Sequence, residues 1–346
     1  MEKTNQPDIQ LQPESVAKNV IDEVVHTDPY GQKPVSEEVV PVEKKMEVSN
    51  VEEKKALEIF MEEQEEERIK IEQEEERLKN LPPIVEFRNV SKIFNPGTKK
   101  EFKALENLNA VVHDIPNKGE IISIVGPSGC GKSTAINLLA GFQSICPPTT
   151  GQVLVNGDPV KGPGIDRGMI FQKYSSFPHL TVLQNVCFGM EINKAKLGMS
   201  SKEIVERARE KIVKVGLGRH ENKHPNQLSG GQQQRLAIAR TLVLKPRIIL
   251  MDEPTRIEMQ RMTVHLWEDT KCTIFIITHS LIEAVYLSDR VWIFSNAPGR
   301  IIKEISDVHI PSSSDNSLEV QKCPKFMEKV DEVSEVIKEL GGEEDA

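Results

Sequence analysis

A glycine-rich segment at residues 126–134, GPSGCGKST, has the residue types and spacing needed to hold a chain of phosphates. Its glycines let the backbone curl so that successive N–H groups face a phosphate, and the helix-like KSTAINLLAG that follows adds a positive dipole end. In this pattern Lys132 reaches the β- and γ-phosphates, and Ser133 ligates Mg²⁺. A glycine-rich turn without a ligand would not explain the apolar strand before it and the helix after it. The residues expected to bind nucleotide here are Gly126, Pro127, Ser128, Gly129, Cys130, Gly131, Lys132, Ser133 and Thr134.

Two acidic residues, Asp252 and Glu253, follow the apolar run RIILM, which has the character of a buried strand. At the carboxyl end of such a strand, Asp252 can hold Mg²⁺ through water. Glu253 can polarise an attacking water as a general base. Acids at a strand end are common, so the pair alone is weak evidence. Combined with the phosphate loop, it indicates ATP hydrolysis with Mg²⁺.

A second pair of glycines lies in LSGGQQQR at residues 228–235, directly before another helix-like segment. The backbone N–H groups of this turn suit a phosphate, although Ser229 also fits a plain N-cap of the helix. Together with the phosphate loop and the two acids, L-S-G-G-Q resembles the signature of the ABC ATPases. The resemblance covers about residues 84–340. The residues that it implies for nucleotide contact are Ser229, Gly230, Gly231 and Gln232.

The resemblance implies roles for three further residues. Gln172, in MIFQKYSS, matches the glutamine that approaches the metal and links the nucleotide to the membrane partner. His279, in IITHS, matches the histidine that contacts the γ-phosphate; its alternative role is that of an ordinary histidine at a strand end. Phe94, in VSKIFNPG, is the candidate for the aromatic residue that stacks on adenine, and it fits a packing role equally well.

The same resemblance implies an assembly around ATP and Mg²⁺. In this family two ATPase subunits pack head to tail, and each ATP lies between the Lys132 loop of one subunit and the Ser229–Gly231 turn of the other. The implied partners are a second ATPase subunit, two transmembrane permease subunits and, indirectly, a solute-binding protein. Phrases such as SSFPHLTVLQNVCFG and SLIEAVYLSDRV look like the nitrate/sulfonate/taurine importer group, which predicts uptake of a small anionic solute. The alternative is a non-transport ABC protein that uses ATP binding for regulation or for recruiting a partner.

One segment departs from the family pattern. After Asp-Glu-Pro the family continues with a small-residue turn ending in A-L-D, the D-loop, whereas this chain passes directly from Pro254 to TRIEMQ. Only 279 − 252 = 27 positions separate Asp252 from His279. The D-loop is therefore expected to be missing after Pro254, which predicts ATP binding with strongly reduced hydrolysis. Three explanations remain open: a segment lost from this sequence, a natural protein with weak hydrolysis, or a local compensation that preserves it.

The elements that must position these residues follow from the hydrophobic pattern. Apolar runs such as GEIISIVG, RIILMD and TIFIITH alternate with helix-like segments at 202–215 and 231–244, which predicts an α/β fold with a mostly parallel sheet core. The earliest strands have no helix between them and predict an antiparallel β flank. We expect an ABC ATPase domain at 84–310, a helical signature subdomain at about 175–228, and a C-terminal helix and acidic tail at 311–346.

The remaining chain differs in composition from this domain. Residues 1–50 lack a sustained period and are predicted to be disordered. Residues 51–83 form a Glu-rich segment, interpreted as a charged helix or linker, that carries most of the net charge of −9. With the rest close to neutral, an extended nucleic-acid surface is not expected. There is no C-x-x-C pair and no apolar run of ~18–20 residues, which favours a cytoplasmic protein that reaches the inner face of the membrane peripherally, through its partners.

Overall fold

The computed structural model divides the chain into two compact units, residues 1–80 and 81–346. Of the first unit it describes only Arg68, an exposed residue in a helix, so the predictions for residues 1–50 and for most of 51–83 lie outside the described residues. The second unit contains every other described residue. The described residues are 68, 81–115, 119–171, 176–252, 267, 270–306, 321 and 323–341.

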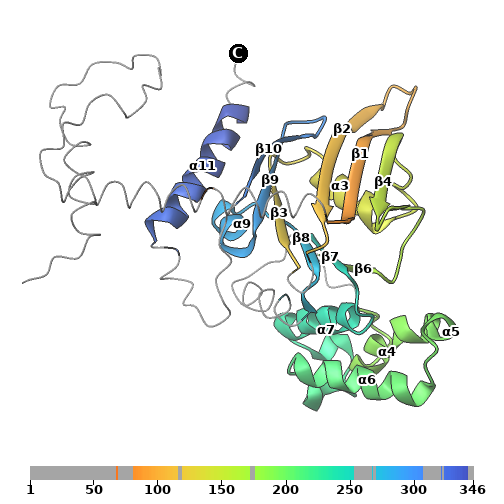
Figure 1. Cartoon of the computed structure of the whole chain (residues 1–346). Helices are drawn as coiled ribbons and strands as arrows, with labels where there is room; N and C mark the ends of the chain where they lie inside the picture. Colours follow the sequence, from red (N-terminus) through yellow and green to blue (C-terminus); the bar gives the residue numbers. More distant parts are fainter. Residues whose placement is uncertain are drawn as a thin grey trace, which may run out of the picture. The chain divides into compact units, whose positions relative to one another are not determined.

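A six-stranded sheet forms the centre of the second unit, in the order β10-β9-β3-β8-β7-β6 (Figure 1). Strands β6 to β9 and β3 pair in parallel, and β10 runs antiparallel to β9. The sequences IISIV and TIFII are buried at every position, as expected for parallel strands covered on both faces. The bounds are β3 (Ile121–Val125), β6 (Arg167–Ile170), β7 (Ile248–Asp252), β8 (Thr273–Ile277), β9 (Arg290–Phe294) and β10 (Ile301–Ile305).

A second sheet of four antiparallel strands has the order β2-β1-β4-β5, which confirms the predicted β flank. Helix α3 (Lys132–Ala140) contacts β2 and β4 of this sheet and β6, β7 and β8 of the other, so it lies between the two sheets (Figure 1). The strand bounds are β1 (Pro83–Phe94), β2 (Phe102–His113), β4 (Thr150–Val155) and β5 (Asp158–Pro159).

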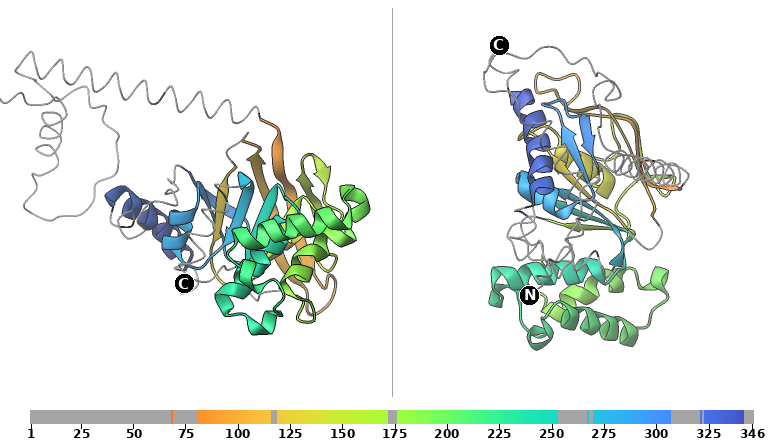
Figure 2. Two further views of the ribbon diagram at one scale, coloured as in Figure 1. Left: turned by 90° about the horizontal axis from the view of Figure 1, so that it is seen from below. Right: turned by 60° about the vertical axis from the view of Figure 1, so that its left-hand side comes forward.

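Four helices make a separate lobe, seen in green to teal in all the views (Figures 1 and 2). They are α4 (Val182–Ile192), α5 (Lys194–Leu197), α6 (Ser201–Lys214) and α7 (Gly230–Leu242). Helix α9 (Leu281–Leu287) packs against β3 and β9, and α11 (Pro324–Gly341) packs against α9. Short 3₁₀ turns occupy Gly218–His220 and Pro225–Gln227. Within the described residues we find no helix with both the length and the apolar character needed to span a bilayer.

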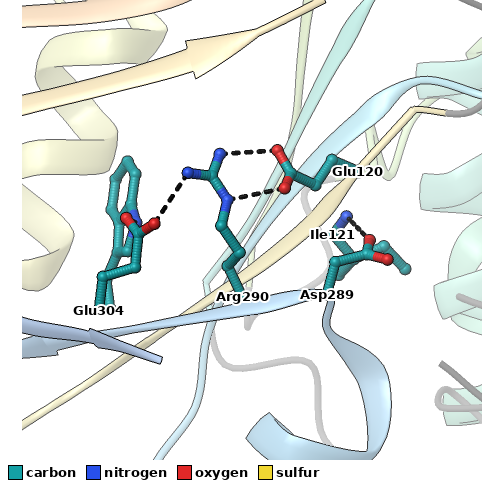
Figure 3. Close-up of polar contacts among 6 residues, drawn as sticks. Glu120, Ile121, Asp289, Arg290 and Glu304 are labelled. Carbon is teal, nitrogen blue, oxygen red and sulfur yellow. Dashed lines mark hydrogen bonds and ion pairs between the residues drawn. The ribbon is translucent and has the colours of Figure 1, made fainter. Parts of the chain in front are cut away.

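A largely buried ion-pair network lies at the edge of the sheet where β3 and β9 begin (Figure 3). Arg290 donates from Nε and Nη2 to the two carboxylate oxygens of Glu120, both at 2.7 Å, and from Nη1 to Glu304 at 3.1 Å. Asp289 accepts a hydrogen bond from the backbone N–H of Ile121 at 2.8 Å. Burial acts to lower the pKa of the Arg290 guanidinium, but Glu120 and Glu304 outweigh it and hold the pKa above its ordinary value. The network therefore joins β3, β9 and β10.

Replacing Arg290 by methionine is expected to lower the free energy of unfolding by about 3–5 kcal/mol, because it leaves a buried carboxylate without its partner. That carboxylate belongs to Glu120, which is 8% exposed. Urea unfolding followed by circular dichroism measures the effect. The matched control is Lys303→Met, which breaks an ion pair between Lys303 and Glu332 whose side chains are 43% and 36% exposed. Such a pair contributes less than about 1 kcal/mol; equal losses in the two variants would contradict the prediction.

Candidate nucleotide site

The phosphate loop connects β3 to α3 through three glycines in left-handed conformations, with φ of 147° at Gly126, 78° at Gly129 and 102° at Gly131. A Cβ at Gly131 would lie 2.5 Å from the carbonyl oxygen of Ala104, and one at Gly126 would lie 2.8 Å from that of Phe294. Both positions therefore require glycine on two grounds, conformation and space. The loop is seated between β2 of one sheet and β9 of the other.

Lys132 is the first residue of α3 and is only 5% exposed. Its ammonium group donates to the carbonyl oxygens of Gly126 at 2.8 Å and Pro127 at 2.7 Å, across the loop that it closes. The neighbouring Cys130 is buried, and burial raises the pKa of its thiol despite the charge of Lys132. The thiol of Cys130 therefore does not neutralise the charge of Lys132, and the ammonium group of Lys132 suits an anionic phosphate.

The structure brings Ser133 and Asp252 together, although 119 positions separate them in the sequence. The hydroxyl of Ser133 donates to Oδ1 of Asp252 at 3.4 Å. Ser133 is the second residue of α3, and Asp252 is the last residue of β7, at the carboxyl edge of the parallel sheet. A hydroxyl and a carboxylate oxygen side by side are the hard oxygen donors that Mg²⁺ prefers. These two residues therefore fit the metal that accompanies a bound nucleoside triphosphate.

The other predicted catalytic residues differ in how far the structure describes them. His279 is exposed and lies two residues beyond the end of β8. Because Asp252 pairs with Ile277 in the parallel ladder, His279 follows β8 at the same edge of the sheet as Asp252. Gln172 and Glu253 lie outside the described residues, as does the segment from Glu253 to residue 266 that includes the expected D-loop gap.

The signature turn forms the beginning of α7. Ser229 is the N-cap: its hydroxyl accepts from the N–H of Gln232 at 3.4 Å, while the side chain of Gln232 accepts from the N–H of Ser229 at 3.0 Å. The helix-capping role considered for Ser229 is confirmed. The cap formed by Ser229 fixes the direction of the first turn of α7. In this turn the N–H groups of Gly230 and Gly231 have no acceptor within the helix. The turn remains capable of presenting these groups to an anion.

Phe94 is the last residue of β1 and is half-buried. Its ring lies 5.7 Å from the ammonium group of Lys92, and its backbone pairs with Phe102 of β2. Ala104, two residues farther along β2, is the residue whose carbonyl faces Gly131 of the phosphate loop. Phe94 therefore belongs to the end of the antiparallel sheet that borders the loop, and its contact with adenine stays a prediction.

Gly299, in the turn between β9 and β10, is a contact of the phosphate loop that the sequence analysis missed. Its N–H donates to the carbonyl of Ala104 at 2.9 Å, and its own carbonyl accepts from Glu106 at 3.1 Å. A Cβ at Gly299 would lie 1.9 Å from the carbonyl oxygen of Cys130. The segment SNAPGRI signals a turn, but nothing local in it reveals that the turn supports a loop 169 positions earlier.

Substituting Gly299 by alanine is expected to push the phosphate loop out of place, at a cost of about 1–3 kcal/mol for the overpacking. If half of that cost falls on nucleotide binding, the dissociation constant for ATP rises about two- to tenfold. Titration with a fluorescent ATP analogue measures the change. Gly162→Ala is the control, because a Cβ at Gly162 meets no atom within 4 Å. Equal affinities for the two variants would show that the loop tolerates the added methyl group.

Comparison with known proteins gives a consistent result. Residues 108–256 match the family model described as ABC transporter. An uncharacterized ABC transporter ATP-binding protein of Methanocaldococcus jannaschii is 44% identical over 67% of this chain and 85% of its own length. The nitrate import ATP-binding protein NrtD of Synechocystis is 37% identical (73% and 95% covered), and the taurine import ATP-binding protein TauB of Pelagibacter ubique is 38% identical (72% and 93%).

Solved structures agree with these relatives. The dimeric structure of an ATP-binding cassette in a post-hydrolysis state, bound to ADP and Pi, is 33% identical, with a TM-score of 0.54. The match covers 64% of this chain and 98% of that structure. The predicted α/β architecture, with a parallel core, an antiparallel flank and a helical lobe that carries the signature turn, is confirmed.

Proposed function

Because the chain belongs to the ABC transporter family, we propose that it is the ATP-binding and ATP-hydrolysing subunit of an importer for a small anionic solute. The main observation behind the proposal is the 3.4 Å hydrogen bond between the hydroxyl of Ser133 and Oδ1 of Asp252. This pair lies beside the phosphate loop, to whose carbonyl at Gly126 Lys132 donates. A phosphate cradle and a pair of oxygen ligands in one place are what binding of Mg·ATP requires. The nitrate and taurine import proteins among the relatives support the choice of substrate class.

Each residue has a stated task in this proposal. Lys132 and the loop N–H groups would bind the β- and γ-phosphates, and Ser133 and Asp252 would hold the metal. Mg²⁺, when bound, neutralises charge on the phosphate oxygens. Glu253 accepts a proton from the attacking water. Gln172 approaches the metal, and His279 contacts the γ-phosphate from the end of β8.

A second copy of the chain completes each site. Ser229 to Gln232 of one subunit would face the γ-phosphate held by the Lys132 loop of the other, with the N-terminus of α7 supplying N–H donors and a positive dipole end. A related cassette was solved as a dimer, which supports this arrangement. ATP binding then closes the dimer, and closure acts on two permease subunits. We place the protein on the inner face of the membrane, attached through those subunits.

A groove beside the helical lobe is the surface that we assign to the permease. Its volume is about 300 Å³, and its lining includes Phe171, Phe188 and Ile192, which are 37%, 37% and 69% exposed. Arg240 lies over the ring of Phe177 at 4.6 Å, and burial lowers the pKa of its guanidinium. Exposed aromatic and aliphatic side chains around a half-buried cation suit an amphipathic helix of a partner.

Reconstitution tests the proposal. The chain is co-purified with permease subunits encoded beside its gene and placed in vesicles with the solute-binding protein. We expect ATP-dependent uptake of an anion such as nitrate or taurine, and loss of the complex in Ile192→Glu with ATP binding intact. Ile282→Glu, on α9 away from the groove and 45% exposed in the wild type, is the matched control. The proposal fails if no anion is taken up, or if Ile192→Glu and Ile282→Glu assemble equally well.

A further inference from the structure

A second cavity, of about 400 Å³, lies at the opposite edge of the parallel sheet from the nucleotide site. Its lining includes Arg247 and Thr273, which stand at the beginnings of β7 and β8, whereas Asp252 and His279 follow the ends of the same strands. Each strand has five residues, and five residues at about 3.3 Å each span roughly 16 Å. The cavity is therefore separate from the phosphate loop.

Cations dominate the lining of this cavity, which we call the lysine cavity. The charged residues that line it are Lys211, Lys214, Lys245, Arg247, Lys271 and Asp114. Asp114 is the one carboxylate among the described lining residues, and it forms an ion pair with Arg247, which also donates to Asn156 at 2.9 Å. Four lysines also line the cavity, in a protein whose formal net charge is −9; of these, Lys211 forms an ion pair with Glu210 at 3.3 Å, and Lys271 lies over the ring of Trp267. Such a concentration of positive charge runs against the overall charge of the chain.

Capping of helix ends accounts for only part of this cluster. Lys211 and Lys214 lie in the last turn of α6, where cations offset the negative end of the helix dipole. Lys245 and Lys271 lie instead in the short connections that lead into β7 and β8, with φ of 53° and 51°. Left-handed backbone of this kind favours glycine or asparagine over a residue with a long side chain. The backbone conformation therefore does not by itself call for lysine at either position, although the ammonium group of Lys271 also lies 4.8 Å from the centroid of the Trp267 ring.

We propose that the lysine cavity binds a small polyanion that carries two or more phosphate groups. A volume of about 400 Å³ is that of a small-molecule site, and it excludes a duplex or a folded peptide. Ammonium groups act as point charges that bind phosphate oxygens through charge-assisted hydrogen bonds. Lys211 and Lys214 belong to the helical lobe, whereas Lys245 and Lys271 belong to loops of the sheet core, so the bound polyanion joins the two.

Calorimetric titration of the full chain with pyrophosphate tests the proposal, with saturating ADP present so that the phosphate loop is occupied. We expect one pyrophosphate per chain. The double variant Lys245→Gln/Lys271→Gln should weaken binding about tenfold or more, given the usual strength of hydrogen bonds to charged groups. The control is Lys202→Gln, which removes the charge of a lysine on α6 that is 87% exposed and does not line the cavity. This variant should bind pyrophosphate like the wild type.

A parallel titration with citrate separates phosphate from carboxylate recognition. Weaker binding of citrate than of pyrophosphate supports the proposal, whereas tighter binding of citrate overturns the assignment to phosphate. Absence of saturable pyrophosphate binding, or equal binding by the wild type and the double variant, overturns the site itself. Thermal melting confirms that each variant is folded; if the double variant is not, Lys211→Gln/Lys214→Gln provides the same comparison from the other side of the cavity.

Discussion

Replacing Lys132 by alanine is expected to raise the dissociation constant for ATP about 100-fold, because charge-assisted hydrogen bonds contribute about 1.5–3 kcal/mol each. The ammonium group is nearly buried and is already held against the carbonyls of Gly126 and Pro127, at the place where a bound phosphate would lie. Its position is therefore set before nucleotide arrives, and little side-chain entropy remains to be lost on binding. Isothermal titration with ATP measures the change.

Two comparisons separate the charge of Lys132 from its role in bracing the loop. Lys202→Ala removes an exposed lysine of α6 and should leave ATP affinity unchanged. Ser133→Ala keeps Lys132 and its contacts to the loop carbonyls, and should weaken binding of ATP only when Mg²⁺ is present. An ATP affinity that survives Lys132→Ala would remove the phosphate loop from the proposed site, and with it the main support for an ATP-driven function.

Inserting S-A-L-D after Pro254 is expected to raise the rate of ATP hydrolysis about 100-fold, because small displacements of reacting groups cost catalysis on that order. The family resemblance implies that a D-loop would lie beside the phosphate loop of the partner subunit and help to position the attacking water. The sequence passes from Asp252-Glu253-Pro254 directly to Thr255, from which we predict that this loop is missing. Release of inorganic phosphate at saturating Mg·ATP measures the rate before and after the insertion.

The controls for this experiment test chemistry and length separately. An insertion of G-G-S-G has the same length without the family's side chains, and should restore less activity. Glu253→Gln in the restored chain should abolish hydrolysis, because the amide cannot accept the proton of the attacking water. An uninserted chain that already turns over at an ordinary rate of about 1–10 s⁻¹ would show that the gap is harmless.

Local patterns were sufficient to predict strands such as β3, β7 and β8, and to indicate the phosphate loop and the signature turn. The run IISIV is apolar at every position, and the glycines at 126, 129 and 131 are demanded by a backbone that curls within a few residues. Ser229 and Gln232 carry their capping chemistry in a spacing of three residues. In each case the interacting residues are near neighbours in the chain, so the local structure can be predicted without knowledge of the fold.

Only the tertiary structure could show which distant residues meet. Ser133 and Asp252 approach because helix α3 begins at the edge of the sheet where strand β7 ends. Gly299 lies against Cys130 because the turn after β9 returns to the phosphate loop. The lysine cavity assembles side chains from α6, from the connection after α7 and from the loop before β8. The sequence alone determined the chemistry available to this protein, because residue types and short spacings are local. The fold decided which of those groups act together, because strand order and packing set distances that sequence separation does not contain.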